Sequence, residues 1–192
     1  MGSEMCIRDR TFTASIRQRE PSMPTETSSS VIVIREATAN DFDSIWLFFE
    51  AIARAGETYA YARDIDKESA FSLWLEQPRI TLVAEFEGRI VGSYYIKTNN
   101  QGPGSHVCNC GYMVADEARG RGVAREMCLH SQTLARQLGY RAMQFNFVAS
   151  SNVAAVALWT KLGFATVGVL PLAFEHPVVG FVDALVMHKP LV

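Results

Sequence analysis

The feature that most restricts the fold is a glycine-rich turn between a strand pattern and a helix pattern. In the segment MVADEARGRGVAREM, an apolar run ends at Val114 and a helical pattern begins after Gly122. Gly120 and Gly122 let the backbone approach an anion, and the first N–H groups of a helix have no partner within it. The turn therefore suits a phosphate or pyrophosphate. It matches neither a Walker loop nor G-x-G-x-x-G, and a plain solvent-exposed turn with two arginines is the alternative.

Hydrophobic periodicity on both sides places this turn in an α/β domain. Apolar runs predict strands at 31–37, 80–86, 89–97, 106–114, 141–149, 165–170 and 181–187. Apolar residues at helical spacing predict helices at 42–55, 67–76, 123–138 and 152–162, each followed by a glycine or proline. The order β-α-α-β-β-β-α-β-α-β-β predicts one α/β sandwich with a mixed sheet.

Composition excludes several classes of protein. A chain of 192 residues suits one ordinary domain with a tail, and a hydrophobic content of 48% excludes global disorder. Its 18 basic and 20 acidic residues give a net charge of −2, so general nucleic-acid binding is not expected. No run of about 20 apolar residues is present, so no membrane span is expected.

Four cysteines are too few for a disulfide framework in a chain of this length. Cys108 and Cys110 share one face of a predicted strand. A zinc site needs two more ligands at matching spacing, and His106 is the only neighbour of the right type. We therefore expect no metal, and reduced thiols in a cytoplasmic protein.

The first thirty residues differ from the rest. They hold four basic and four acidic residues, six serines and a single aromatic, Phe12, without an apolar period. We expect a disordered or foreign extension at 1–30 and a folded domain at 31–192. A mitochondrial presequence is the alternative, which the four acids disfavour.

Two motifs together resemble one known superfamily. Arg119-x-x-Gly122-x-Ala124 matches the pattern Q/R-x-x-G-x-G/A at a strand-to-helix junction. The helix pattern from Asn152 to Phe164 has an asparagine near its start, then small residues and Lys-x-Gly-Phe. Both segments resemble the GCN5-related N-acetyltransferase (GNAT) superfamily. The resemblance implies the fold of that superfamily, a single α/β domain with a mixed, mostly antiparallel central sheet flanked by helices.

The same resemblance implies acetyl-CoA as the acetyl donor and indicates which residues hold it. The backbone from Gly120 to Ala124 would bind the pyrophosphate. The end of the strand at Met113 and Val114 would pair with the pantetheine arm, which Asn152 would also contact. The implied cofactor-binding set is Met113, Val114, Arg119, Gly120, Arg121, Gly122, Val123, Ala124 and Asn152.

The chain departs from the superfamily pattern at Trp159, where many members have a tyrosine proposed to protonate the leaving thiolate. An indole N–H donates hydrogen bonds but is no usable acid, so we interpret Trp159 as a core or pocket-wall aromatic. A thiol pKa of about 8.5 makes the thiolate a fair leaving group, so either another group or none protonates the sulfur. The sequence marks no general base; the candidates are Glu57, Glu85, Glu87, His106 and His176.

Three asparagines are candidates for a neutral polar pocket. Asn109 lies in a strand pattern, where asparagine is disfavoured, and Asn146 alternates with Phe145 and Phe147 and so faces the other side of its strand. The spacing of Asn109, Asn146 and Asn152 is similar to that of fungal acetyltransferases that act on azetidine-2-carboxylate and related proline analogues. That resemblance implies that Asn109 and Asn146 bind a substrate carboxylate. It also implies that Asn146 and Asn152 are the catalytic residues, with Asn152 positioning the acetyl donor.

We therefore expect an acetyl-CoA-dependent N-acetyltransferase for a small amine, with a cyclic imino acid or another amino-acid-like compound as the candidate acceptor. The amine would attack the thioester directly, and a backbone N–H near Val114 would hold the oxyanion. Phosphinothricin-type acceptors and polyamines are alternatives, although a polyamine calls for an acidic cleft. A non-catalytic acyl-CoA-binding module is the alternative from another class. A homodimer through the C-terminal strands is expected by analogy.

Overall fold

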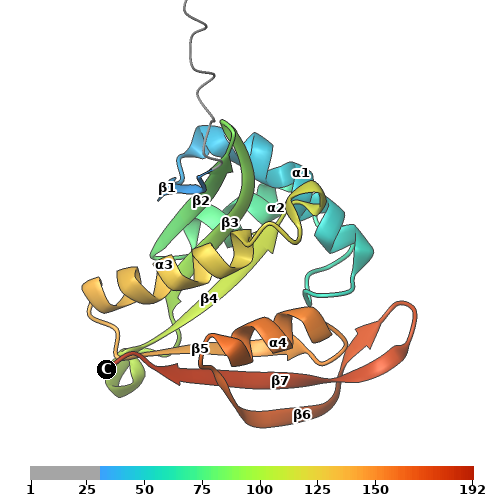
Figure 1. Cartoon of the computed structure of the whole chain (residues 1–192). Coiled ribbons are helices and arrows are strands. Elements are labelled where there is room, and N and C mark those ends of the chain that lie inside the picture. The colour runs from blue at the N-terminus through green and yellow to red at the C-terminus, as the bar shows by residue number, and fades with distance from the viewer. Residues whose placement is uncertain (1–30) are drawn as a thin grey trace, which may run out of the picture.

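A seven-stranded sheet organises residues 31–192, the part of the chain that the computed structural model describes (Figure 1). The strand order is β1-β2-β3-β4-β5-β7-β6. The strands are β1 (Val33–Glu36), β2 (Ile80–Phe86), β3 (Arg89–Thr98), β4 (Val107–Val114), β5 (Ala142–Ala149), β6 (Ala165–His176) and β7 (Gly180–Pro190). Among these strands β4 and β5 run parallel, and every other neighbouring pair is antiparallel. The predicted mixed, mostly antiparallel sheet is confirmed.

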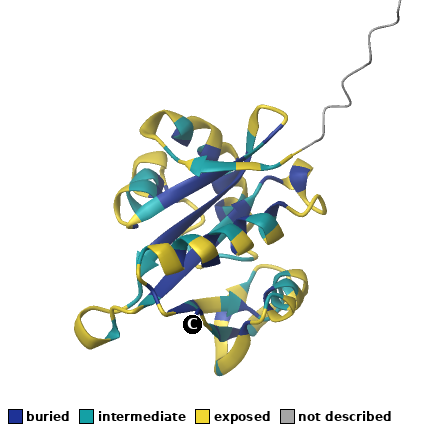
Figure 2. Ribbon diagram, turned by 60° about the vertical axis from the view of Figure 1, so that its left-hand side comes forward, coloured by how far each residue is buried: buried dark blue, intermediate teal, exposed yellow. Residues whose placement is uncertain are grey.

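Helices cover both faces of this sheet. They are α1 (Phe42–Ala55), α2 (Lys67–Phe71), α3 (Val123–Gln137) and α4 (Val153–Lys161). A π-helical turn, Ser72–Glu76, continues α2 to the end of the predicted helix. One buried cluster joins the sheet to α1 and α2, and a second joins it to α3 and α4. Figure 2 shows buried residues along the strands and on the inner sides of the helices.

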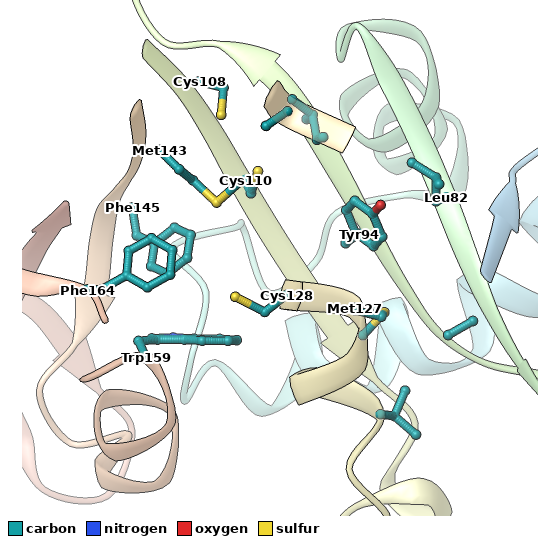
Figure 3. Packing of buried hydrophobic residues seen from close by; sticks show 14 of the residues in the cluster. Leu82, Tyr94, Cys108, Cys110, Met127, Cys128, Met143, Phe145, Trp159 and Phe164 are labelled. Carbon is teal, nitrogen blue, oxygen red and sulfur yellow. The ribbon is translucent and has the colours of Figure 1, made fainter. Parts of the chain in front are cut away.

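The alternation of side chains along β4 separates the two clusters. Tyr112 packs with Phe145 and Trp159 on the side of α3 and α4, where Figure 3 shows the rings of Phe145 and Trp159 close together. Its neighbour Met113 belongs to the opposite cluster with Trp74. Because successive side chains of a strand point to opposite faces, β4 can contribute to both cores.

The sheet opens between β4 and β5. These strands pair at three positions, with Asn109 opposite Gln144 as the last pair. Beyond this point they diverge, as Figure 1 shows. On its other side β5 pairs with β7, with a register shift between Phe145 and Val148. The extra residue of such a bulge bends a strand and increases its twist, which turns the end of β5 away from β4.

Two details differ from the prediction. The C-terminal strands β6 and β7 are longer than the predicted ranges 165–170 and 181–187. β6 continues through Pro171, because a proline is tolerated in a strand at the edge of a sheet. The pairing of β6 with β7 shifts register between Leu170 and Phe174. Within this stretch Leu172 has a φ of 51°, and its N–H donates to Asp183 Oδ1 at 2.9 Å. The predicted alternation in β5 holds at Phe145 but breaks at the bulge, so Phe147 is exposed.

The predicted extension at 1–30 lies outside the described residues, so the domain boundary at residue 31 stays a prediction. No helix within residues 31–192 is long and apolar enough to cross a membrane. Among the same residues, no group of three or more His, Cys, Asp and Glu side chains could hold a metal ion. Cys108, Cys110 and Cys128 are buried free thiols.

Candidate active site

The gap between β4 and β5 opens into a cavity of about 650 Å³, a size typical of small-molecule sites. It reaches both faces of the sheet, because its lining includes Tyr112 and Trp159 from one buried cluster and Tyr95 and Met113 from the other. We call the side of α3 and α4 the donor half and the side of α1 and α2 the acceptor half. A ligand in the donor half can therefore meet a second ligand that enters from the opposite face.

The glycine-rich turn lies at the donor half. Gly120 and Gly122 have φ values of 74° and 83°, in the left-handed region that favours glycine. No side chain caps the N-terminus of α3, so the first N–H groups of this helix are available to an anion. Arg119 forms an ion pair with Asp116 at 2.8 Å, and the Arg121 guanidinium lies 5.4 Å from the centre of the Phe86 ring.

Not every residue of the predicted cofactor set lines the cavity. Met113, Val114, Arg119, Ala124 and Asn152 do, whereas Gly120, Arg121, Gly122 and Val123 form the adjoining turn and the start of α3. The Val123 side chain is buried in the core, so this residue can offer a ligand its backbone N–H alone.

The backbone of β4 presents unpaired polar groups to the gap. Ala115 N donates to Val91 O at 2.9 Å, so Ala115 and Val91 are a hydrogen-bonded pair of the β3–β4 ladder. Residues whose backbone bonds to β3 alternate with residues whose N–H and C=O point the other way. Val114 therefore directs its N–H and C=O into the gap, whereas Met113 pairs with Ser93 and contributes its side chain. An extended ligand could pair with Val114 as a strand would.

Two polar groups between β5 and α4 also face the donor half. Asn152 Oδ1 accepts from Ala155 N at 3.2 Å and so caps α4, and its amide nitrogen donates to no other described residue. Ser151 Oγ is buried and has no hydrogen-bond partner among the described residues. Both residues line the cavity. A buried polar group without a partner is costly, so these two groups suit a ligand that carries amide and carbonyl groups.

Asn109 connects three strands by hydrogen bonds at the point where the sheet opens. Its side chain is 6% exposed, its Oδ1 accepts from Tyr95 OH at 3.2 Å, and its Nδ2 donates to Gln144 O at 2.9 Å. It thus connects β3, β4 and β5 at their last common level. Gly111 makes room for this arrangement, because a Cβ there would lie 2.7 Å from Cε1 of Tyr95.

Asn146 lies across the gap on the acceptor half. Its Oδ1 accepts from Gln144 Nε2 at 2.8 Å, and its Nδ2 donates to Asn99 Oδ1 at 2.6 Å. The structure therefore brings Asn109, Asn146 and Asn152 to one cavity, as the sequence predicts. Each of them also has a hydrogen bond within the protein, so each has a structural role beside any role toward a ligand.

Trp159 is a wall of the cavity, which confirms its predicted interpretation. It is 8% exposed, and its ring lies 5.1 Å from Tyr112 and 5.3 Å from Phe145 between centroids. Nearby phenols hold their protons tightly. Burial raises the pKa of Tyr61 to about 12 and raises the pKa of Tyr59 well above its usual value. At neutral pH these groups act as hydrogen-bond donors, and Tyr59 OH donates to Tyr112 O at 2.8 Å.

Of the five candidate bases, Glu57 and His176 line the cavity. The other three lie elsewhere: Glu85 forms an ion pair with Arg35 at 2.6 Å, Glu87 occupies the β2–β3 turn, and His106 lies in an exposed loop. The Nδ1 atom of His176 accepts from Val178 N at 3.2 Å. The neutral imidazole therefore carries its proton on Nε2.

The cavity-lining residues that the sequence analysis missed include Tyr59, Tyr61, Lys97 and Ser151, which carry polar side chains. The tyrosines belong to the segment AGETYAYARD between α1 and α2, and nothing local shows that it reaches across to β4. Lys97 occupies a strand position where a solvated lysine is ordinary. Only the register of β3 with β4 brings it opposite Asn109.

Residues 41–164, more than half of the chain, match the model of the Acetyltransferase (GNAT) family. The chain belongs to this family. A curated relative, N-acetyltransferase aca1 of Schizosaccharomyces pombe, is 30% identical over 109 residues, which make up 55% of this chain and 51% of the relative. The chain thus spans about half the length of that relative. The predicted resemblance to the GNAT superfamily is confirmed.

Solved structures agree with this family. A GCN5-related N-acetyltransferase from Kribbella flavida is 44% identical, with a TM-score of 0.79 over 83% of this chain and 97% of that chain. The structure of yncA from Salmonella typhimurium with its cofactor acetyl-CoA is 20% identical, with a TM-score of 0.73 over 85% of this chain and 95% of that chain. The second likeness shows the fold alone, and together they confirm the predicted GNAT fold.

The contact between Gly111 and Tyr95 gives a first prediction. In Gly111→Ala the new Cβ would overlap the Tyr95 ring, and the ring would have to leave its place beside Asn109. We expect a loss of about 1–3 kcal/mol in the free energy of unfolding, measured with urea. The matched control is Gly168→Ala in β6, where a Cβ would meet Val186 at an ordinary 3.7 Å. Equal stability of the two variants would contradict this packing.

Proposed function

We propose that this acetyltransferase transfers an acetyl group from acetyl-CoA to the amine of a small, amino-acid-like compound. One observation supports the proposal: the cavity passes through the sheet between β4 and β5, with the glycine-rich turn at its donor half and polar side chains, among them Asn109 and Asn146, at its acceptor half. Such a passage lets two substrates meet from opposite faces, as direct transfer requires.

The donor half suits acetyl-CoA, which supplies an activated acetyl thioester when bound. We assign the pyrophosphate to the N–H groups of Gly120 through Ala124 and to Arg119 and Arg121. The pantetheine arm, which carries amide groups, suits Val114, Ser151 and Asn152. The N–H of Val114 that points into the gap is our candidate donor to the developing oxyanion.

The acceptor half suits a small polar amine. Asn109 and Asn146 face it, and each amide nitrogen has a second hydrogen that it could offer to a ligand. Among the cavity-lining residues Glu57 is the one carboxylate, which disfavours a polyamine. Glu57 is our candidate proton acceptor for the amine, because Nδ1 of a neutral His176 ring already accepts from Val178 N and its Nε2 carries the proton. A cyclic imino acid stays the candidate acceptor.

A homodimer and a cytoplasmic location stay predictions. Exposed apolar side chains gather on β6 and at the start of β7, where Leu172 of β6 and Phe181 of β7 are both 63% exposed. Because β6 is an edge strand with unpaired backbone groups, this is the surface on which we would place a second copy.

The function is tested by thiol release from acetyl-CoA over a panel of amino acids, imino acids, phosphinothricin and polyamines. We expect release with amino-acid-like acceptors and little with polyamines. Acetyl-CoA binding without release for any amine would instead identify a non-catalytic acyl-CoA-binding module.

The cofactor site is tested by Gly122→Glu, which places a negative charge where the pyrophosphate should lie. We expect the rise in melting temperature caused by acetyl-CoA to disappear. Gly139→Glu is the matched control at the opposite end of the 15-residue helix α3, because Gly139 also has a positive φ and open space around its Cβ position. Acetyl-CoA should still stabilise this control. Undiminished stabilisation of Gly122→Glu would rule out the assigned pyrophosphate site.

The two roles of Asn152 can be separated by substitution. Asn152→Ser keeps an oxygen that caps α4 but removes the amide, so we expect near-native unfolding stability and acetyl-CoA binding weaker by about fivefold. Asn152→Ala loses the cap as well and should cost a further 0.5–2 kcal/mol or so of stability. Calorimetric titration and urea unfolding measure the two effects. Native acetyl-CoA affinity in Asn152→Ser would confine Asn152 to capping.

A further inference from the structure

Lys97 is a partly buried cation without a partner among residues 31–192. No carboxylate of these residues lies within ion-pair distance of it, and its ammonium group donates to no acceptor among them. Lys189 is also partly buried, and its Nζ donates to Gln132 Oε1 at 2.5 Å and to Leu162 O at 2.6 Å. Lys97 thus differs from the other partly buried lysine of the described chain, since it keeps its donors free.

The position of Lys97 places it in the acceptor half of the cavity. It lies directly opposite Asn109 in the β3–β4 register, so both side chains stand on the same face about 5 Å apart at Cβ. Its Nζ lies 5.3 Å from the centre of the Tyr95 ring, whose face is electron-rich. Tyr95 therefore steadies the ammonium group beside the cavity without neutralising it.

The surroundings of this ammonium group suit an anion. Its neighbours Asn109 and Tyr95 are neutral, and Asn146 completes the polar wall of the acceptor half. The one carboxylate that lines the cavity, Glu57, is not paired with Lys97. Arg119 also lines the cavity, but it lies at the glycine-rich turn and forms an ion pair with Asp116. Lys97 thus provides an unpaired positive charge in the acceptor half, where an anionic group of the substrate can pair with it.

We propose that Lys97 binds the carboxylate of the acceptor, so that the substrates of this enzyme are amines carrying a carboxylate close to the nitrogen. The inference rests on the proposed function and deepens it. The Tyr95 ring beside the Lys97 ammonium group packs on Gly111, which lies three residues, or about 10 Å, along β4 from the candidate oxyanion donor Val114. The flexible stem of Lys97 and a small amino acid can together span this separation.

The sequence analysis gave the substrate carboxylate to Asn109 and Asn146, whereas here Lys97 makes the main contact with it. Asn109 and Asn146 already donate to Gln144 O and Asn99 Oδ1, so each can add at most one hydrogen bond to a substrate. Lys97 supplies the charge that tells a carboxylate from a neutral group. Charge-assisted hydrogen bonds are roughly twice as strong as neutral ones, so Lys97 carries the discrimination.

The test compares acids with their neutral counterparts. Azetidine-2-carboxylate, proline and alanine are each assayed beside their own carboxamides, with wild type, Lys97→Met, Lys97→Arg and the control Lys161→Met on the exposed side of α4. For the acid that reacts best we expect Lys97→Met to lower kcat/KM by about 10- to 100-fold. The carboxamide should change less than threefold, and Lys97→Arg should retain most of the preference for the acid. Lys161→Met should behave as wild type.

A second readout keeps the result independent of turnover. Acetyl-CoA should raise the melting temperature of Lys97→Met as much as that of wild type, which shows that the variant is folded with an intact donor half. Binding of the N-acetylated acid by calorimetry should weaken in Lys97→Met by a similar factor to kcat/KM. Equal losses for acid and carboxamide, or no loss for either, would overturn the assignment of Lys97 while leaving acetyl transfer intact. Failure of every amine to release thiol would instead overturn the proposed function. Absence of calorimetric binding by every N-acetylated acid to wild type would overturn the Lys97 site itself.

Discussion

The separation of β4 from β5 is the constraint on which the chemistry of this protein depends. Where two strands part inside a sheet, backbone N–H and C=O groups lose their partners, and such groups are costly if they stay buried and unpaired. Val114 presents its groups to that gap, and Ser151 and Asn152 stand on the opposite side with free hydrogen-bonding capacity. The extended ligand that we propose would satisfy these groups together. The same opening connects the two faces of the sheet and so allows donor and acceptor to meet.

Specific side chains keep the opening in place. Asn109 bonds to Tyr95 on one side and to the Gln144 backbone on the other, at the last level where β3, β4 and β5 lie together. Gly111 admits the Tyr95 ring that this arrangement needs. Asparagine is disfavoured in strands because it packs poorly on a pleated surface. Here its two-sided amide connects strands that are about to separate, which an apolar residue could not do.

Charge is distributed over the two halves of the cavity in a way that matches two anionic partners. The N-terminus of α3 presents N–H groups and a positive dipole end to the donor half, and Lys97 presents a full positive charge to the acceptor half. An amino acid bound with its carboxylate at Lys97 would have its ammonium group in the field of the same cation. A nearby positive charge lowers the pKa of an ammonium group. It thereby favours the neutral amine that attacks a thioester, and Glu57 can accept the proton.

The sequence alone determined the order of the elements, the glycine-rich turn and the family, because these depend on local pattern: apolar periodicity, the paired glycines at 120 and 122, and two short motifs. It also pointed to Asn109, Asn146 and Asn152, which the structure brings to one cavity. Only the tertiary structure decided what these asparagines bond to, how far β6 runs past Pro171, and that Glu57, His176, Lys97 and Ser151 face the cavity. Strand register and the β5 bulge set these relations. Both arise from contacts between residues far apart in the chain, which no local pattern encodes.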